Sequence, residues 1–124
     1  MCIRDRYLLL IYGNEAAWAA MPKEQAGAMY GEYRAFTEAI TKSGNYLGGN
    51  PLQPTSTAST VRVRDGKRAV TDGPFAETKE QLGGYYLVEA KDLDEAIAFA
   101  ARIPGAKVGS IEVRPILQMG PPPA

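Results

Sequence analysis

The feature that most constrains this fold is a run of six apolar residues at positions 7–12, Tyr-Leu-Leu-Leu-Ile-Tyr, which ends at Gly13-Asn14. A strand that is covered on one face alternates between apolar and polar residues, whereas a strand covered on both faces is apolar throughout. The run therefore predicts a central strand of a sheet, with other parts of the protein packed on both of its faces.

A long amphipathic helix is predicted between Pro22 and about Ser43, where Gly44 ends it. Four large apolar residues within it share one face: Met29, Tyr33, Phe36 and Ile40. A ligand-binding wall is one interpretation of this stripe. Core packing against a sheet is favoured, because burial alone explains the helical spacing.

A second helix is predicted over residues 93–102. It begins with Asp92, which is followed three residues later by Glu95 in the manner of a capping box, and it stops at Pro104-Gly105. Its predicted buried face consists of Leu93, Ala96, Ile97 and Ala100.

The other segments are predicted strands. Tyr46-Leu47 forms a short strand that breaks into a loop at residues 48–51, and residues 57–64 and 67–71 form a hairpin around the turn Asp65-Gly66. Residues 85–90 and 110–117 complete the set, with Pro115 placing part of the last strand at an edge or an end.

The order strand, helix, strand, inserted hairpin, strand, helix, strand predicts an α+β fold, namely a ferredoxin-like antiparallel sheet with both helices on one face. Because the helices cover only one face, a second copy of the sheet is the economical cover for the other. We therefore expect a homodimer packed sheet to sheet, with a cavity between the helix-free face and the loops. Residues 7–117 form the domain, residues 1–6 are expected to be a poorly ordered leader, and residues 118–124 an extended tail.

Composition excludes several classes of function. The chain has no histidine, which rules out Ser-His and Cys-His nucleophilic mechanisms, and we expect neither a metal site nor a cofactor. Fourteen basic and fourteen acidic residues give a net charge of zero, so direct nucleic-acid binding is not expected. A single cysteine, and no apolar window as long as a membrane span, predict a protein of the cytoplasm with no membrane contact.

The most unusual stretch is residues 71–86, where turn residues, opposed charges and tyrosines gather between two predicted strands. Asp72-Gly73-Pro74 must bend the chain, because Gly73 can adopt a positive φ and Pro74 restricts it. Asp72 is either a general base or ligand contact at a strand end, or an aspartate that caps the turn. Gly83 and Gly84 are interpreted as glycines that the backbone geometry requires and not as a phosphate-binding loop, since no phosphate-binding pattern follows them.

Ten residues are candidates for a site. Asp72 is the candidate for catalysis, and the candidates for ligand binding are Tyr12, Phe75, Glu77, Lys79, Glu80, Tyr85, Tyr86, Glu112 and Arg114. Tyr85 and Tyr86 must point to opposite faces of their strand, so at most one of them belongs to the site. The charges at positions 77–80 either line a pocket or form a solvated loop. Glu112 and Arg114 share a face, and a structural ion pair is favoured over catalysis.

Asp72-Gly73-Pro74-Phe75, the following Ala-Glu-Thr-Lys-Glu and Leu82-Gly83-Gly84-Tyr85-Tyr86 resemble the YCII-related superfamily, in particular its DGPF-motif branch. The resemblance extends to residues 7–12, 94–96 and 111–115. It implies a dimeric α+β barrel of ferredoxin-like units. Branch members begin with Met and a basic residue just before the tyrosine, whereas six unrelated residues precede Tyr7 here. The His-Asp pair credited to better-known relatives cannot be transferred to a chain without histidine.

Two hypotheses of function follow. In the first, the cavity binds a small polar or aromatic molecule and turns it over by metal-independent acid–base chemistry. In the second, the protein is a non-catalytic accessory or regulatory module, because the resemblance implies an association with extracytoplasmic-function sigma factors.

Overall fold

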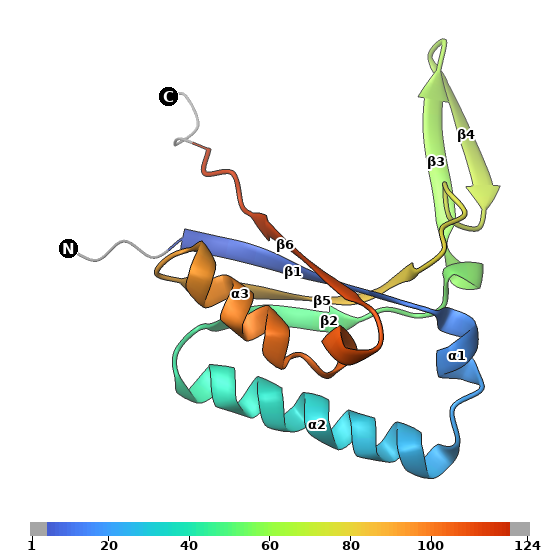
Figure 1. Ribbon diagram of the computed structural model, residues 1–124. Helices are drawn as coiled ribbons and strands as arrows, with labels where there is room; N and C mark the ends of the chain where they lie inside the picture. The colour runs from blue at the N-terminus through green and yellow to red at the C-terminus, as the bar shows by residue number, and fades with distance from the viewer. Residues whose placement is uncertain (1–4, 120–124) are drawn as a thin grey trace.

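The computed structural model describes residues 5–119 and shows a mixed α+β fold (Figure 1). A four-stranded antiparallel sheet has the order β2-β5-β1-β6, which is compatible with the ferredoxin-like fold, and β3 and β4 form a separate two-stranded sheet. The elements are β1 (Asp5–Gly13), α1 (Glu15–Ala19), α2 (Lys23–Lys42), β2 (Tyr46–Pro51), the 3₁₀ turn η1 (Thr55–Thr57), β3 (Ser59–Arg64), β4 (Lys67–Asp72), β5 (Gln81–Ala90), α3 (Leu93–Arg102), the 3₁₀ turn η2 (Pro104–Lys107) and β6 (Ser110–Pro115).

The central strand β1 lies between β5 and β6, as its apolar sequence predicts. It begins at Asp5, two residues earlier than expected, and Asp5 pairs with Ala90 of β5. Leu9 and Ile11 are buried under the helices, whereas Leu8 and Leu10 lie on the other face and are half-buried. Within one chain, therefore, only one face of β1 is fully covered.

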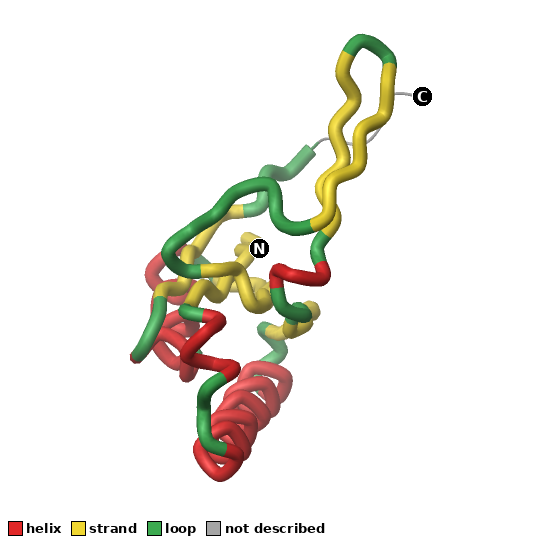
Figure 2. Tube along the Cα trace, turned by 90° about the vertical axis from the view of Figure 1, so that its right-hand side faces the viewer, coloured by secondary structure: helices red, strands yellow, loops and turns green. Residues whose placement is uncertain are grey.

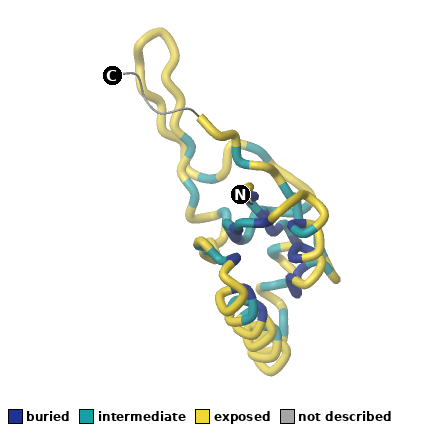
Figure 3. Tube along the Cα trace, turned by 90° about the vertical axis from the view of Figure 1, so that its left-hand side faces the viewer, coloured by how far each residue is buried: buried dark blue, intermediate teal, exposed yellow. Residues whose placement is uncertain are grey.

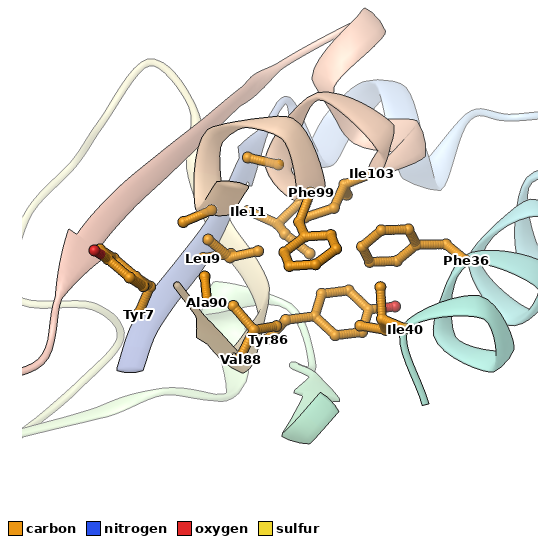
Figure 4. Close-up of a cluster of buried hydrophobic side chains, with 12 residues drawn as sticks. Tyr7, Leu9, Ile11, Phe36, Ile40, Tyr86, Val88, Ala90, Phe99 and Ile103 are labelled. Atoms are coloured by element: carbon orange, nitrogen blue, oxygen red, sulfur yellow. The ribbon is translucent and has the colours of Figure 1, made fainter. Parts of the chain in front are cut away.

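The hydrophobic core lies between the sheet and helices α2 and α3, which cover the same face (Figures 1 and 4). Tyr86 is at its centre, with its ring 5.2 Å from that of Phe36 in an edge-to-face arrangement. Tyr85, the preceding residue, points to the helix-free face beside Leu10, its partner in the register.

Helix α2 confirms the predicted bounds and stripe. Pro22 is its N-cap, Ser43 is its C-cap, and Gly44 follows with a φ of 78°. Only the C-terminal half of the stripe is fully buried, because Phe36 and Ile40 lie in the core while Met29 and Tyr33 are half-buried.

Helix α3 has the predicted cap, since Asp92 Oδ1 accepts a hydrogen bond of 2.9 Å from Glu95 N–H. The prediction for its buried face is partly wrong. Ala96 and Ala100 are buried as expected, but Leu93 and Ile97 are 47% and 48% exposed. Phe99 and Ile103 are buried in their place. They also form a helical stripe with the two alanines, and together they bring more apolar surface into the core than Leu93 and Ile97 would.

Strand β2 does not break at Gly48-Gly49 as predicted but continues to Pro51 along the edge of the sheet. A Cβ on Gly49 would lie 2.7 Å from the carbonyl oxygen of Tyr85, so the glycine permits a close approach of two backbones. Strand β5 likewise begins at Gln81, four residues before the predicted start.

The inserted hairpin is confirmed, and its turn residues Asp65 and Gly66 have φ values of 52° and 74°. It projects from the sheet on the side opposite α2 and α3 (Figures 1 and 2). Every residue from Val61 to Asp72 is exposed (Figure 3). The N–H of Gly73 donates a 2.6 Å hydrogen bond to the carbonyl of Ala58, which closes the base of the hairpin.

Among residues 5–119, no helix is both long enough and apolar enough to cross a membrane. The expectations for residues 1–4 of the leader and 120–124 of the tail lie outside the described residues.

Candidate functional site

A cavity of about 870 Å³ lies between α2 and the β2–β5 edge of the sheet. This is the helix-covered face, whereas the sequence led us to expect a cavity over the helix-free face. Phe36 and Ile40 of α2 are buried in the core, whereas Met29 and Tyr33 of the same helix are half-buried and line the cavity. The apolar and aromatic part of the lining is Ile11, Trp18, Met21, Ala26, Met29, Tyr30, Tyr33, Tyr46, Pro51, Tyr85 and Tyr86.

Trp18 closes the cavity near the end of β1. Its position on α1 is fixed by Asn14, whose side chain caps the helix by accepting a 3.0 Å hydrogen bond from Ala17 N–H. The indole ring lies over Gly13 and Gly83, and a Cβ on Gly83 would come within 2.5 Å of it. The register between β1 and β5 shifts next to these glycines, after Ile11. Both glycines thus provide the space in which the ring lies.

Among the hydroxyl groups that line the cavity are those of Tyr33, Thr37 and Tyr86. Thr37 Oγ1 donates to the backbone carbonyl of Tyr33 at 2.9 Å and lies 2.8 Å from the hydroxyl of Tyr86. Because threonine has one hydroxyl hydrogen, Tyr86 acts as the donor in the second bond. The hydroxyl of Tyr33 accepts a 3.1 Å hydrogen bond from Gly105 N–H in η2, so its own hydrogen can be donated to a ligand.

Burial raises the pKa of Tyr33 above its usual 10.0; the hydrogen bond from Gly105 lowers it, and the neighbouring Tyr86 raises it again. Burial also raises the pKa of Tyr86 above 10.0. The hydrogen bond with Thr37 lowers this pKa, and the neighbouring Tyr46 raises it. Both side chains are therefore neutral near pH 7. They can orient a ligand by hydrogen bonds, but they cannot serve as phenolate bases.

Charged side chains of α2 lie along the cavity at intervals of four residues, as Arg34, Glu38 and Lys42. All three are exposed, so they line its opening to solvent. Glu38 is the one carboxylate among the described residues that line this cavity.

The residues of the DGPF stretch lie elsewhere. Asp72 is the last residue of β4, opposite Ser59, and is exposed. Phe75 is 79% exposed, and Glu77 and Lys79 are exposed in the loop that follows. Among the described residues, none of these four lines either cavity that we describe. Gly73 has the expected positive φ, 96°.

Four other candidates have defined contacts. Glu80 accepts a 2.8 Å hydrogen bond from Ser110 Oγ, which ties the loop to the start of β6. Glu112 and Arg114 form the expected ion pair, with Arg114 Nε 2.7 Å from Glu112 Oε2. Tyr12 lines a smaller cavity of about 310 Å³, which Trp18 also lines.

Of the predicted site, the structure therefore places Tyr86 in the cavity and separates it from Asp72; Tyr85 borders the cavity, although its side chain points to the helix-free face. Of the two tyrosines, Tyr86 is the one whose hydroxyl lies inside the cavity network. Sequence reasoning missed Trp18, Thr37 and the N-terminal half of the α2 stripe. The available signal was the stripe itself, which we had assigned to core packing.

No group of three or more cysteine, aspartate or glutamate side chains within residues 5–119 is placed to hold a metal ion. Glu15 instead has a structural role. Its carboxylate accepts hydrogen bonds of 2.9 Å from both N–H and Oγ1 of Thr55, and its N–H donates to Gln81 Oε1 at 3.0 Å. These bonds connect α1, η1 and β5 around the Trp18 end of the cavity.

Comparison with known proteins supports the resemblance seen in the sequence. The family model of the YCII-related domain matches residues 6–120. The chain is also similar to an uncharacterized protein of Rhizobium meliloti (strain 1021), with 39% identity over 112 residues that cover 89% of this chain and 90% of the relative. With a match of this extent, the chain belongs to the YCII-related domain family.

Proposed function

We propose that the protein binds a small, largely apolar or aromatic molecule in the cavity between α2 and the sheet. The observation that carries this proposal is the lining: aromatic and methionine side chains line about 870 Å³ of space, and the charged residues Arg34, Glu38 and Lys42 lie at its opening. Ligand sites are typically of about 300–1,000 Å³ and combine an apolar wall with few polar groups.

The polar groups suggest how a ligand is oriented. Tyr33 offers a hydrogen-bond donor, and the oxygen of Tyr86, which donates its hydrogen to Thr37, offers an acceptor. A molecule with one acceptor and one donor on an aromatic body matches this pair.

The test uses the single tryptophan as an internal reporter. Anilinonaphthalene sulfonate is titrated into the protein while Trp18 is excited, and energy transfer from Trp18 reports binding close to the cavity. Ala26→Phe places a ring into the lining and should abolish the transfer, whereas Ala28→Phe, two residues along the same helix and outside the lining, should not. Equal titration curves for the two variants would contradict the proposal.

Acid–base catalysis stays a prediction, and in this cavity it would fall to Glu38. The association with a sigma factor also stays a prediction, as does a catalytic role for Asp72. A turnover assay on any ligand found by the titration, with Glu38→Gln and Asp72→Asn, separates these alternatives from simple binding.

We further propose that two copies pair through their helix-free sheet faces, as in a dimeric α/β barrel. Cross-strand pairs Leu8–Leu87 and Leu10–Tyr85 form an apolar centre on this face, and all four side chains remain half-buried within one chain. Adjacent apolar groups that remain partly accessible to solvent are typical of protein interfaces.

Sedimentation equilibrium tests the pairing. Leu87→Asp should convert a dimer to a folded monomer, because a carboxylate would be buried without a partner. Leu93→Asp is the matched control, since Leu93 is 47% exposed at the start of α3 on the other side of the sheet. A wild-type chain that is monomeric at high micromolar concentration would contradict the pairing.

A further inference from the structure

We infer that the β3–β4 hairpin is an arm that holds a second copy of this chain. This inference rests on the proposed pairing of sheets and assigns to the hairpin a role that the pairing itself does not require. Its first support is position. The hairpin projects from the sheet on the side away from α2 and α3, so it stands beside the helix-free face (Figures 1 and 2). A second copy that covers this face therefore lies next to the hairpin.

The second support is the composition of the two hairpin faces. Residues directly opposite each other in an antiparallel pair share a face. Val61 faces Val70 in the register, and Val63 is on the same side two residues along. These valines are 57–60% exposed. The face that carries these three valines also holds Arg68, opposite Val63, and the pair Ser59–Asp72 at the base of the hairpin. An exposed cluster of three valines therefore lies in the middle of this face.

An exposed apolar cluster is costly for so small an element. A two-stranded hairpin alone is marginally stable in water and needs a third strand or a packed surface. In the register, β3 and β4 pair only with each other among the described strands. Packing of the three valines against a partner would supply the missing cover.

The third support is charge. Residues 59–72 contain Arg62, Arg64, Lys67 and Arg68 against two acidic residues, Asp65 and Asp72, which gives a net charge of +2. Since the whole chain has fourteen residues of each sign, the rest carries −2. The arm of one copy and the body of another therefore attract each other electrostatically.

The test excises the arm from the full chain. Because Gly73 N–H bonds to the carbonyl of Ala58, the two ends of residues 59–72 already lie together, and a short glycine linker can replace them. The dimer dissociation constant is measured by sedimentation equilibrium over a series of protein and salt concentrations. We expect excision to raise the constant about tenfold or more and to reduce its salt dependence.

A pair of point variants tests the valine cluster. Val70→Asp and Ala69→Asp introduce the same charge at neighbouring exposed positions on opposite faces of β4. Only Val70→Asp should weaken the dimer by about tenfold, since Val70 belongs to the contacting face. Circular dichroism confirms that the sheet and helices are retained in each variant.

The outcomes separate this inference from the pairing of sheets. If the wild type is a dimer whose dissociation constant is unchanged by excision and by Val70→Asp, the inferred role of the arm is overturned. The proposed pairing of the sheets then still stands. A monomeric wild type overturns both. Labelled duplex DNA is titrated in parallel; binding that depends on the arm, with an unchanged dimer constant, would assign the basic hairpin to nucleic acid and overturn the inference.

Discussion

The indole ring of Trp18 occupies the space that a side chain at position 83 would need. A Cβ on Gly83 would lie 2.5 Å from Cη2 and 2.6 Å from Cζ3 of the ring. Residues 65 positions apart in sequence are thus matched in size, and the match fixes one end of the cavity.

Gly83→Ala should destabilise the protein by about 1–3 kcal/mol, because the new methyl group collides with a rigid ring. It should also shift the fluorescence emission of Trp18. Gly48→Ala is the control, since a Cβ there meets nothing within 4 Å and alanine is favoured over glycine in a strand. Chemical denaturation measures both; equal stability of the two variants would show that the ring does not occupy this place in solution.

Thr37→Val should cost about 1 kcal/mol more than Thr41→Val. Each threonine donates to the backbone carbonyl four residues earlier, at 2.9 Å and 2.7 Å, but only Thr37 also bonds to Tyr86. The substitution leaves the Tyr86 hydroxyl without this partner. When Tyr86 ionises, Thr37 can turn its hydroxyl hydrogen toward the phenolate and so lower the pKa of Tyr86. Valine cannot do this, so the substitution should raise that pKa further, which ultraviolet titration of the phenols detects. Identical stabilities and titration curves for the two variants would contradict this.

Stability should fall at alkaline pH. The pKa values of Tyr33 and Tyr86 are raised in the folded state above the ordinary 10.0. The folded protein therefore holds these protons more tightly than the unfolded chain, and the resulting stabilisation is present below about pH 10 and is lost as pH rises above it. Thermal melts across this range should show a shallower decline for Tyr33→Phe and Tyr86→Phe than for the control Tyr30→Phe, whose ring is 67% exposed. The same slope in all three would refute the assignment.

Asp92→Ala should lower stability by about 1 kcal/mol through loss of the α3 cap. Asp94→Ala removes the same charge from the same helix end without removing a cap, and should cost only about 0.3 kcal/mol. The difference between the two melting temperatures isolates the capping bond from the charge. If Asp94→Ala costs as much as Asp92→Ala, the helix dipole rather than the bond accounts for the effect.

Most of the architecture could be predicted because it depends on local signals. Pro22 and Gly44 bracket α2, Asp65-Gly66 specifies the hairpin turn, and the apolar run at 7–12 specifies a central strand. Each of these signals acts within a few residues, so the sequence alone carries it. Gly48-Gly49 misled the prediction, because glycine there serves a close approach to β5 and not a turn.

The site was harder to predict because it depends on distance between elements. Periodicity identifies which face of α2 is apolar, but it does not say how far the helix lies from the sheet. Met29 therefore carries the same pattern as Ile40, although one lines a cavity and the other lies in the core. Similarly, Phe99 and Leu93 compete for the buried face of α3, and only the packing of the whole core decides between them.

The uneven burial of α2 has a mechanical consequence. Phe36 and Ile40 fix the C-terminal half of the helix in the core, whereas residues 23–28 are all exposed. A slight tilt of α2 about Phe36 and Ile40 would therefore change the distance between Met29 and the sheet, and so the depth of the cavity there, without disturbing the core. Backbone amide exchange should be faster in the N-terminal half of α2 than in the C-terminal half.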